Sequence, residues 1–217
     1  MDNIELLIFD CDGVLVDTEN VANNVLHRHL SLHNWPLAPT ATEQFFRGRS
    51  LTESLRRAVN EFQLTLPADF LQVMQRDTFE QFRQVNLSFP NCKVLVQQLS
   101  ACAFPMCVAS SGSHEKIALT LSQTGLLGYF PIRFSAQDVT RAKPAPDLFL
   151  KASSYFCTPP ERCLVIEDSS AGLAAADAAG MPSIGLNTQL SAAQQRDFPN
   201  TLFLQDHAAL LRWMNGH

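Results

Sequence analysis

Three short apolar runs, each followed at once by polar side chains, constrain the fold of this chain more than any other feature. The runs span residues 6–9, 106–109 and 163–166, and weaker runs lie at 182–185 and 201–203. A continuous apolar run of about four residues is typical of a strand that is buried on both faces. Such strands occur mainly in parallel sheets, so the runs favour an α/β fold.

Helical stretches lie between these runs. They are predicted at Cys92–Ala101, His114–Thr124, Pro146–Phe156 and Ala171–Ala179. Gly125 and Gly180 follow two of them and provide stop signals. Alternating strands and helices predict right-handed crossovers and a parallel sheet covered by helices on both faces.

The segment from about Asp17 to Gln84 breaks this alternation and shows only helical patterns. Leu71, Met74, Thr78 and Phe82 recur at the three- and four-residue spacing of an amphipathic helix. The segment therefore predicts an all-helical insert directly after the first strand.

Composition limits the kind of partner. The net charge of −5 gives no field that favours nucleic acid or an anionic membrane. A small anionic substrate remains compatible with this charge if positive side chains are concentrated at one site. The six cysteines form no C-x-x-C pair and indicate buried thiols in a reducing compartment. The N-terminus lacks a signal-peptide pattern, and the longest apolar run is too short to span a bilayer. We expect a cytoplasmic protein and, without a coiled-coil pattern, a monomer.

Polar residues at the ends of the predicted strands suggest a reaction site. Asp10, Asp12, Ser110, Glu167 and Asp168 follow three strands, and the carboxyl ends of parallel strands meet at one edge of a sheet. Two neighbouring carboxylates repel one another unless a cation lies between them, and oxygen-only ligands favour Mg²⁺. One carboxylate can then attack a phosphate while the second protonates the leaving oxygen.

Taken singly, the same residues have ordinary explanations. Asp10 and Asp12 also fit a pair of solvated turn carboxylates, and Ser110 fits a turn hydroxyl. Lys143 fits a solvated loop lysine. Glu167 and Asp168 fit caps of the helix that follows them.

Longer strings of sequence favour the catalytic interpretation. Four segments resemble, in the family's own order, the motifs of the haloacid dehalogenase superfamily, and in particular its β-phosphoglucomutase-like phosphatases. The segments are Ile8–Glu19, Val108–Gly112, Lys143–Asp147 and Ile166–Gly172.

The resemblance implies a Rossmann-like core of residues 1–15 and 86–217, with a helical cap of residues 16–85. It implies Asp10 as the nucleophile, Asp12 as the acid and base, and Ser110 and Lys143 as ligands of the phosphate. Mg²⁺ would be bound by the Asp10 side chain, the Asp12 carbonyl and Asp168, with Glu167 nearby. Further substrate contacts are expected from Ser111, Gly112 and His114. Arg47 and Arg49 are candidates for binding the non-reacting end of the substrate, and they fit solvated cap arginines equally well.

Dehalogenation and the mutase reaction are the two other activities of the superfamily that the sequence has to be weighed against. Dehalogenases of the superfamily do not need a second aspartate, so Asp12 favours phosphoryl transfer. The mutase branch carries a cap histidine where this chain has Ala22, and a cap arginine where it has Leu51. A phosphatase acting on sugar or sugar-acid phosphates is therefore expected, with a β-phosphoglucomutase-type isomerase as the alternative. A non-catalytic phospho-acceptor is disfavoured because every catalytic motif position is filled.

Overall fold

The computed structural model describes residues 3–46 and 51–216 of the 217-residue chain. The chain divides into two compact units. One, termed the sheet unit, comprises Met1–Asp17 and Asn86–His217, and the other, termed the helical unit, is Thr18–Val85.

The sheet unit is built on a six-stranded parallel sheet in the order β3-β2-β1-β4-β5-β6. The strands are β1 (Leu6–Phe9), β2 (Met106–Ser110), β3 (Arg133–Ser135), β4 (Cys163–Glu167), β5 (Ser183–Leu186) and β6 (Thr201–Leu204). Ile8 of β1 pairs with Cys107 of β2 on one side and with Val165 of β4 on the other. The predicted α/β fold with a parallel sheet is confirmed, and the first strand lies between the two strands whose polar ends follow it in the motif order.

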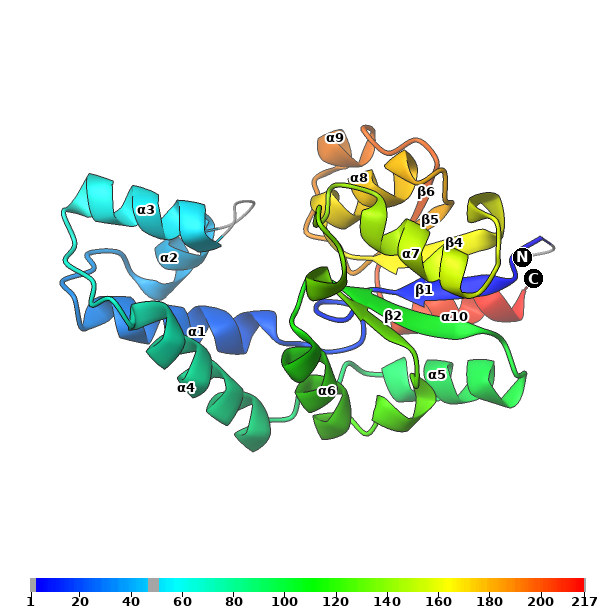
Figure 1. Ribbon diagram of the computed structural model, residues 1–217, viewed down its shortest axis with the longest axis horizontal. Coiled ribbons are helices and arrows are strands. Elements are labelled where there is room, and N and C mark those ends of the chain that lie inside the picture. Colours follow the sequence, from blue (N-terminus) through cyan, green and yellow to red (C-terminus); the bar gives the residue numbers. More distant parts are fainter. Residues whose placement is uncertain (1–2, 47–50, 217) are drawn as a thin grey trace. The chain divides into compact units, whose positions relative to one another are not determined.

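Helices cover both faces of the sheet (Figure 1). They are α5 (Cys92–Ala101), α6 (His114–Gln123), α7 (Asp147–Tyr155), α8 (Ser170–Ala178), α9 (Ala192–Gln195) and α10 (His207–Asn215), with short 3₁₀ turns at Leu127–Tyr129, Ala136–Asp138 and Pro160–Arg162. Helices α7 and α8 lie on one face, and α5, α6 and α10 lie on the other. This arrangement leaves the carboxyl ends of β2, β1 and β4 side by side at one edge.

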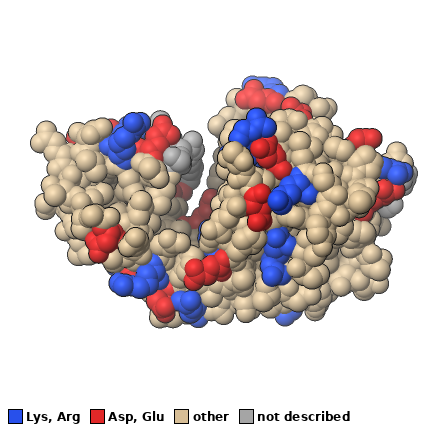
Figure 2. All heavy atoms as spheres, viewed as in Figure 1, with Lys and Arg blue, Asp and Glu red and all other residues tan. Residues whose placement is uncertain are grey.

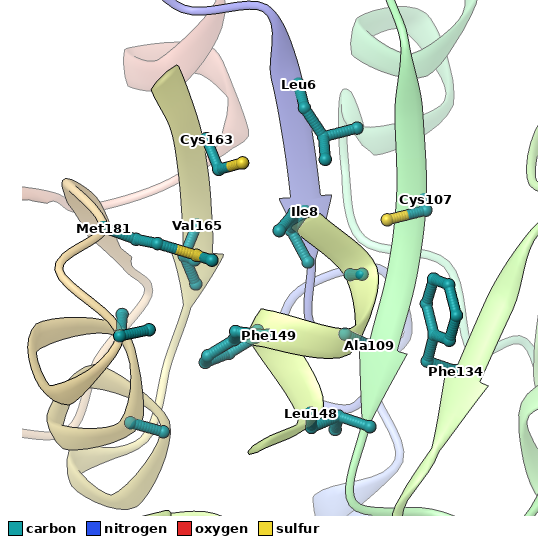
Figure 3. Packing of buried hydrophobic residues seen from close by; sticks show 14 residues of the cluster. Leu6, Ile8, Cys107, Ala109, Phe134, Leu148, Phe149, Cys163, Val165 and Met181 are labelled. Carbon is teal, nitrogen blue, oxygen red and sulfur yellow. The ribbon is translucent and has the colours of Figure 1, made fainter. Parts of the chain in front are cut away.

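A buried apolar cluster joins α7 to the central strands. Figure 3 shows Phe149 of α7 beside Ile8 of β1 and Val165 of β4, with Ala109 of β2 close by. Each of these four side chains is fully buried. Burying one large apolar side chain stabilises a fold by roughly 1.5–3 kcal/mol, so the cluster fixes α7 firmly on the sheet.

The helical unit contains only helices among its described residues: α1 (Glu19–Ser31), α2 (Pro39–Phe46), α3 (Leu51–Phe62) and α4 (Phe70–Gln84). Its core is aromatic, since Trp35 packs edge-on against Phe45, Phe46 and Phe62. The indole N–H of Trp35 donates a hydrogen bond to the buried Thr42 hydroxyl at 2.7 Å. The prediction of a strand-free helical insert agrees with these elements.

Some elements were not predicted. β3 has three residues and begins with a partly exposed arginine, which makes its apolar run too short to recognise. The four-residue α9 and the C-terminal α10 were also missed. The predicted helices themselves begin and end within one residue of those observed.

Acidic and basic side chains are interspersed over the face shown in Figure 2. Among the described residues, none of the helices has the length and apolar character needed to cross a bilayer. All six cysteines carry free thiols.

Candidate active site

The candidate nucleophile, Asp10, is held at the end of β1 between the ends of two other strands. Its backbone N–H donates a hydrogen bond to Ile166 O of β4 at 2.9 Å. Ser110 is the last residue of β2 and Glu167 is the last residue of β4. All three side chains are buried. The structure therefore brings these three sequence-predicted residues to one edge of the sheet.

Lys143 reaches this edge from the loop before α7. Its ammonium group donates hydrogen bonds to Asp10 Oδ1 at 2.6 Å, to Glu167 Oε1 at 2.7 Å and to Ala109 O at 3.0 Å. The Lys143 side chain is only 3% exposed, and its ammonium lies 4.7 Å from the ring centre of Phe149. The three acceptors satisfy all three donors of the ammonium group, as burial of a charge requires.

Glu167 is positioned by the start of the helix that follows it. Its second oxygen, Oε2, accepts hydrogen bonds from Ser169 N at 2.8 Å and from Ser169 Oγ at 2.9 Å. A Cβ at Gly172 would lie 1.8 Å from Glu167 Oε1, so only glycine fits there. Both carboxylate oxygens of Glu167 are thus engaged by the protein, which fits a residue that orients Lys143.

Burial and the charge of the ion-pair partner act in opposite directions on the pKa of Asp10 and on that of Lys143. Burial, together with the negative charges of Glu167 and Asp12, raises the pKa of the Asp10 carboxyl to about 7, although Lys143 acts in the opposite direction. Burial also favours a neutral Lys143, but Asp10 and Glu167 outweigh it and hold the lysine pKa above its ordinary value. Lys143 is therefore a permanent positive charge at this site.

Asp12 lies in a tight turn directly after Asp10. Gly13 N–H donates to Val16 O at 2.9 Å, and Leu15 N–H donates to Cys11 O at 2.8 Å. Gly13 has a φ of +78°, a conformation that glycine adopts without strain. The turn lies within the sheet unit and leaves the Asp12 side chain partly exposed.

Lys116, a residue that was not predicted, forms an ion pair with Asp12. The distance from Lys116 Nζ to Asp12 Oδ1 is 2.8 Å. Lys116 lies in the first turn of α6, three residues after the cap Ser113, whose side chain accepts a hydrogen bond from Lys116 N. The first turn of a helix that directly follows a strand lies near the carboxyl edge of the sheet. The position of Lys116 in such a turn was the sequence signal that could have identified it.

The loop after β2 is shaped by Ser110. The Ser110 hydroxyl accepts a hydrogen bond from Gly112 N at 3.1 Å, and Ser135 Oγ donates to Gly112 O at 2.6 Å. Ser111 is exposed in the same loop. These contacts hold the loop in a fixed turn beside the buried hydroxyl.

Three of the predicted substrate-binding residues, His114, Arg47 and Arg49, remain predictions. His114 Nε2 is 3.0 Å from Asp138 Oδ1, and the backbone N–H of His114 donates to Gln137 Oε1. The described contacts of His114 are thus with the turn after β3 and not with Asp10. Arg47 and Arg49 lie outside the described residues.

Asp168 lies against the turn that carries Asp12. A Cβ at Gly13 would be 2.0 Å from Asp168 Oδ2, so the carboxylate packs directly on the Gly13 backbone. Asp10 Oδ1 accepts a hydrogen bond from Lys143 Nζ at 2.6 Å. Carboxylates that directly follow the first and the fourth strand therefore both lie beside this turn.

The donor set fits a hard divalent cation. Within the described parts of the chain, no three His, Cys, Asp or Glu side chains are grouped closely enough to form a metal centre by themselves. Mg²⁺ commonly uses only one or two protein carboxylates and completes its shell with carbonyl, water and phosphate oxygens. A site of two carboxylates and a backbone carbonyl meets that requirement.

The balance of charge favours such a cation too. The site combines four carboxylates and two ammonium groups, from Asp10, Asp12, Glu167, Asp168, Lys116 and Lys143. When all are ionised, the carboxylates exceed the ammonium groups by two negative charges. A phosphate dianion would be repelled by that excess, and a divalent cation would remove it.

Known proteins are similar to this chain in sequence. Residues 7–186 match the family model described as haloacid dehalogenase-like hydrolase, a span that includes all four motif segments. The chain is 31% identical over 182 residues to the 6-phosphogluconate phosphatase of Escherichia coli (strain K12), and the match covers 83% of this chain and 81% of the relative.

Solved structures agree in fold. A haloacid dehalogenase-like protein of unknown function from Agrobacterium tumefaciens str. C58 superposes with a TM-score of 0.84 at 29% identity, covering 98% of both chains. A family hydrolase from Deinococcus radiodurans R1, solved with bound phosphate and sodium, gives a TM-score of 0.81 at 28% identity, covering 96% of this chain and 93% of that one.

Proposed function

Because this chain belongs to the haloacid dehalogenase-like hydrolase family, we propose that it is a magnesium-dependent phosphatase with Asp10 as its nucleophile. The observation that carries the proposal is the buried ammonium group of Lys143, which donates hydrogen bonds to Asp10 and Glu167 at the ends of adjacent strands. A structural lysine needs no such position beside an acidic pair at the edge of a sheet. A lysine that orients a nucleophile and attracts a phosphate does.

Mg²⁺ would be held by the side chains of Asp10 and Asp168 and by the carbonyl of Asp12, with Glu167 nearby. The bound cation supplies Lewis-acid stabilisation of the phosphoryl oxygens and offsets the excess negative charge of the site. The packing of Asp168 on Gly13 supports this ligand set, since it places a carboxylate next to the backbone of Asp12.

The protein side chains divide the reaction into two steps. The substrate phosphate binds near Ser110 and Lys143, and Asp10 attacks phosphorus while Asp12 gives its proton to the ester oxygen. The alcohol leaves, and Asp10 carries the phosphoryl group. Water then loses a proton to Asp12 as it attacks phosphorus, which releases phosphate and restores Asp10.

The substrate is proposed to be a sugar phosphate or a sugar-acid phosphate. The 6-phosphogluconate phosphatase relative supports this class, since the alignment covers most of both chains. Residues 16–85 are proposed as a cap that selects the leaving group. Ala22 and Leu51 support hydrolysis over the mutase reaction, because the mutase pattern has a histidine and an arginine there.

The setting proposed for the enzyme is the cytoplasm, where it would act as a monomer. Six free thiols, four of them buried, support a reducing compartment.

The test is phosphate release from a panel of phosphorylated metabolites, with Mg²⁺ and with a chelator. Asp10→Asn serves as the inactive control, because an amide keeps the shape of the side chain but cannot act as the nucleophile. We expect metal-dependent release from a few sugar or sugar-acid phosphates and none from the variant. Conversion of β-glucose 1-phosphate without phosphate release would favour the mutase, and full activity of Asp10→Asn would overturn the proposal.

A further inference from the structure

Helix α6 positions Lys116 at the candidate site. Its side chain and that of Asp12 are each 26% exposed, so the 2.8 Å ion pair between them is partly shielded from water. The backbone at Lys116 is fixed at both ends, because its N–H donates to Ser113 Oγ and its carbonyl accepts from Thr120 Oγ1 at 3.0 Å. A lysine fixed in this way differs from a surface lysine, whose pairs usually contribute little.

The ion pair lies beside the predicted phosphate-binding hydroxyl. A Cβ built on Gly112 would lie 3.4 Å from Lys116 Cδ, 3.5 Å from Ser110 Oγ and 3.6 Å from Asp12 Oδ2. The side-chain position of Gly112 is thus bordered by Lys116, Ser110 and Asp12. Lys116 therefore belongs to the same site as Ser110 and Asp12.

The two oxygens of Asp12 have different surroundings. Oδ1 is paired with Lys116, whereas Oδ2 is the oxygen near Gly112 and Ser110. The nearby carboxylates of Asp10 and Asp168 repel Asp12, and an exposed aspartate would otherwise sample several rotamers. The ion pair at Oδ1 opposes that repulsion and holds Oδ2 toward the phosphate side.

We propose that Lys116 is a positioning residue for Asp12, an inference that rests on the proposed function of Asp12 as the acid and base. As the phosphorus–oxygen ester bond breaks, its electron pair goes to the leaving oxygen, which takes the proton of Asp12 and departs as an alcohol. Lys116 keeps the donor oxygen aligned with the leaving oxygen and pairs with the carboxylate that remains. Misplacing a catalytic group by about 1 Å can cost a reaction ~10²-fold.

The role predicts which substrates depend on Lys116. An alkyl phosphate needs its leaving oxygen protonated because an alkoxide is a poor leaving group, whereas p-nitrophenyl phosphate releases a stable phenolate without much help. Lys116→Met should therefore lower kcat on glycerol phosphate or a sugar phosphate by about tenfold or more. Its effect on p-nitrophenyl phosphate should be clearly smaller, and KM should change little on either substrate.

Two further variants and one control test whether the effect of Lys116→Met acts through Asp12. Asp12→Asn should show the same dependence on the leaving group, with a larger loss, because it removes the proton donor itself. Lys116→Arg, which keeps the charge, should recover part of the alkyl-phosphate activity. Lys93→Met changes an exposed lysine of α5 and serves as the control for the change of residue type.

The outcomes separate this inference from the proposed function. Equal losses on both substrates in Lys116→Met would indicate a purely structural role, and a rise in KM alone would indicate direct substrate binding; either overturns the inference. If Asp12→Asn itself shows no dependence on the leaving group, then the assigned role of Asp12 is wrong. Thermal unfolding of every variant identifies losses that arise from misfolding, and Lys116→Gln replaces Lys116→Met if the latter does not fold.

Discussion

The ammonium group of Lys143 donates a hydrogen bond to Asp10 Oδ1 at 2.6 Å, although the two residues lie 133 positions apart in the chain. The same nitrogen is bonded to Glu167 Oε1 at 2.7 Å. These contacts link the loop before α7 to the ends of β1 and β4. One buried charge therefore connects the packing of the sheet to the orientation of the candidate nucleophile.

Replacing Lys143 by methionine should destabilise the protein as well as inactivate it. The Asp10 and Glu167 side chains are 8% and 1% exposed, and the change leaves both carboxylates without their cation. Removing one partner of a buried ion pair typically costs about 3–5 kcal/mol. Urea unfolding of Lys143→Met should show a loss of that order in the free energy of unfolding.

The matched control for this change is Lys93→Met, at an exposed position of α5. Its free energy of unfolding should stay within about 0.5 kcal/mol of the parent value. A similarly small effect of Lys143→Met would contradict the view that this charge stabilises the site.

Gly13→Ala should weaken the response to Mg²⁺. The added methyl group would lie 2.0 Å from Asp168 Oδ2 and would displace that carboxylate from the turn after Asp12. The Mg²⁺ concentration that gives half-maximal activity should therefore rise. Calorimetric titration with Mg²⁺ alone provides a second measurement that does not depend on turnover.

Gly180→Ala separates this effect from backbone strain. Gly180 also has a positive φ, +71° against +78° for Gly13, but no heavy atom lies within 4 Å of its added Cβ. Both variants should lose stability, since L-residues are disfavoured in this conformation. Only Gly13→Ala should change the Mg²⁺ titration, and an equal change in both would remove Asp168 from the ligand set.

The stability of the sheet unit should fall in mild acid through His207. Its Nε2 donates a hydrogen bond to Val14 O at 2.7 Å, and its ring stacks on Phe89 at 5.2 Å. Burial lowers the pKa of His207 below its ordinary value of 6.5, although Val14 O and Asp206 act in the opposite direction. The unfolded chain therefore binds a proton that the folded chain resists.

This difference sets the sign of the pH effect. The contribution of a neutral His207 is complete above pH 6.5 and declines as the pH falls from 6.5 toward the lowered pKa of the folded state. His207→Gln keeps a side-chain N–H but does not titrate. Urea unfolding at pH 8 and pH 5 should show a smaller drop for His207→Gln than for the parent protein, and identical drops would refute the assignment.

The residues of the candidate site could be predicted from the sequence better than the contacts between them. The strand ends at Asp10, Ser110 and Glu167 could be predicted because a buried strand has a characteristic apolar run. The family match confirms the resemblance drawn from the four motifs. The short strand β3 could not be predicted, since its three residues carry too little pattern.

Contacts that depend on tertiary structure were beyond sequence reasoning. The ion pair of Lys116 with Asp12 joins a helix to a turn 104 residues away, and no local pattern marks it. The bond of Ser169 to Glu167 and the close approach of Gly172 likewise arise from how the helix start meets the strand end. Such contacts orient the carboxylates of Asp12 and Glu167 within the fold.

Trapping of the phosphorylated enzyme tests the central claim most directly. The protein is mixed with its best substrate and Mg²⁺, quenched in acid within one turnover, and treated with borohydride, which reduces an aspartyl-phosphate to homoserine. Peptide mass spectrometry should find homoserine at position 10, and none in Asp10→Asn. Phosphate release with homoserine at another position, or with no trapped intermediate at any quench time, would contradict Asp10 as the nucleophile.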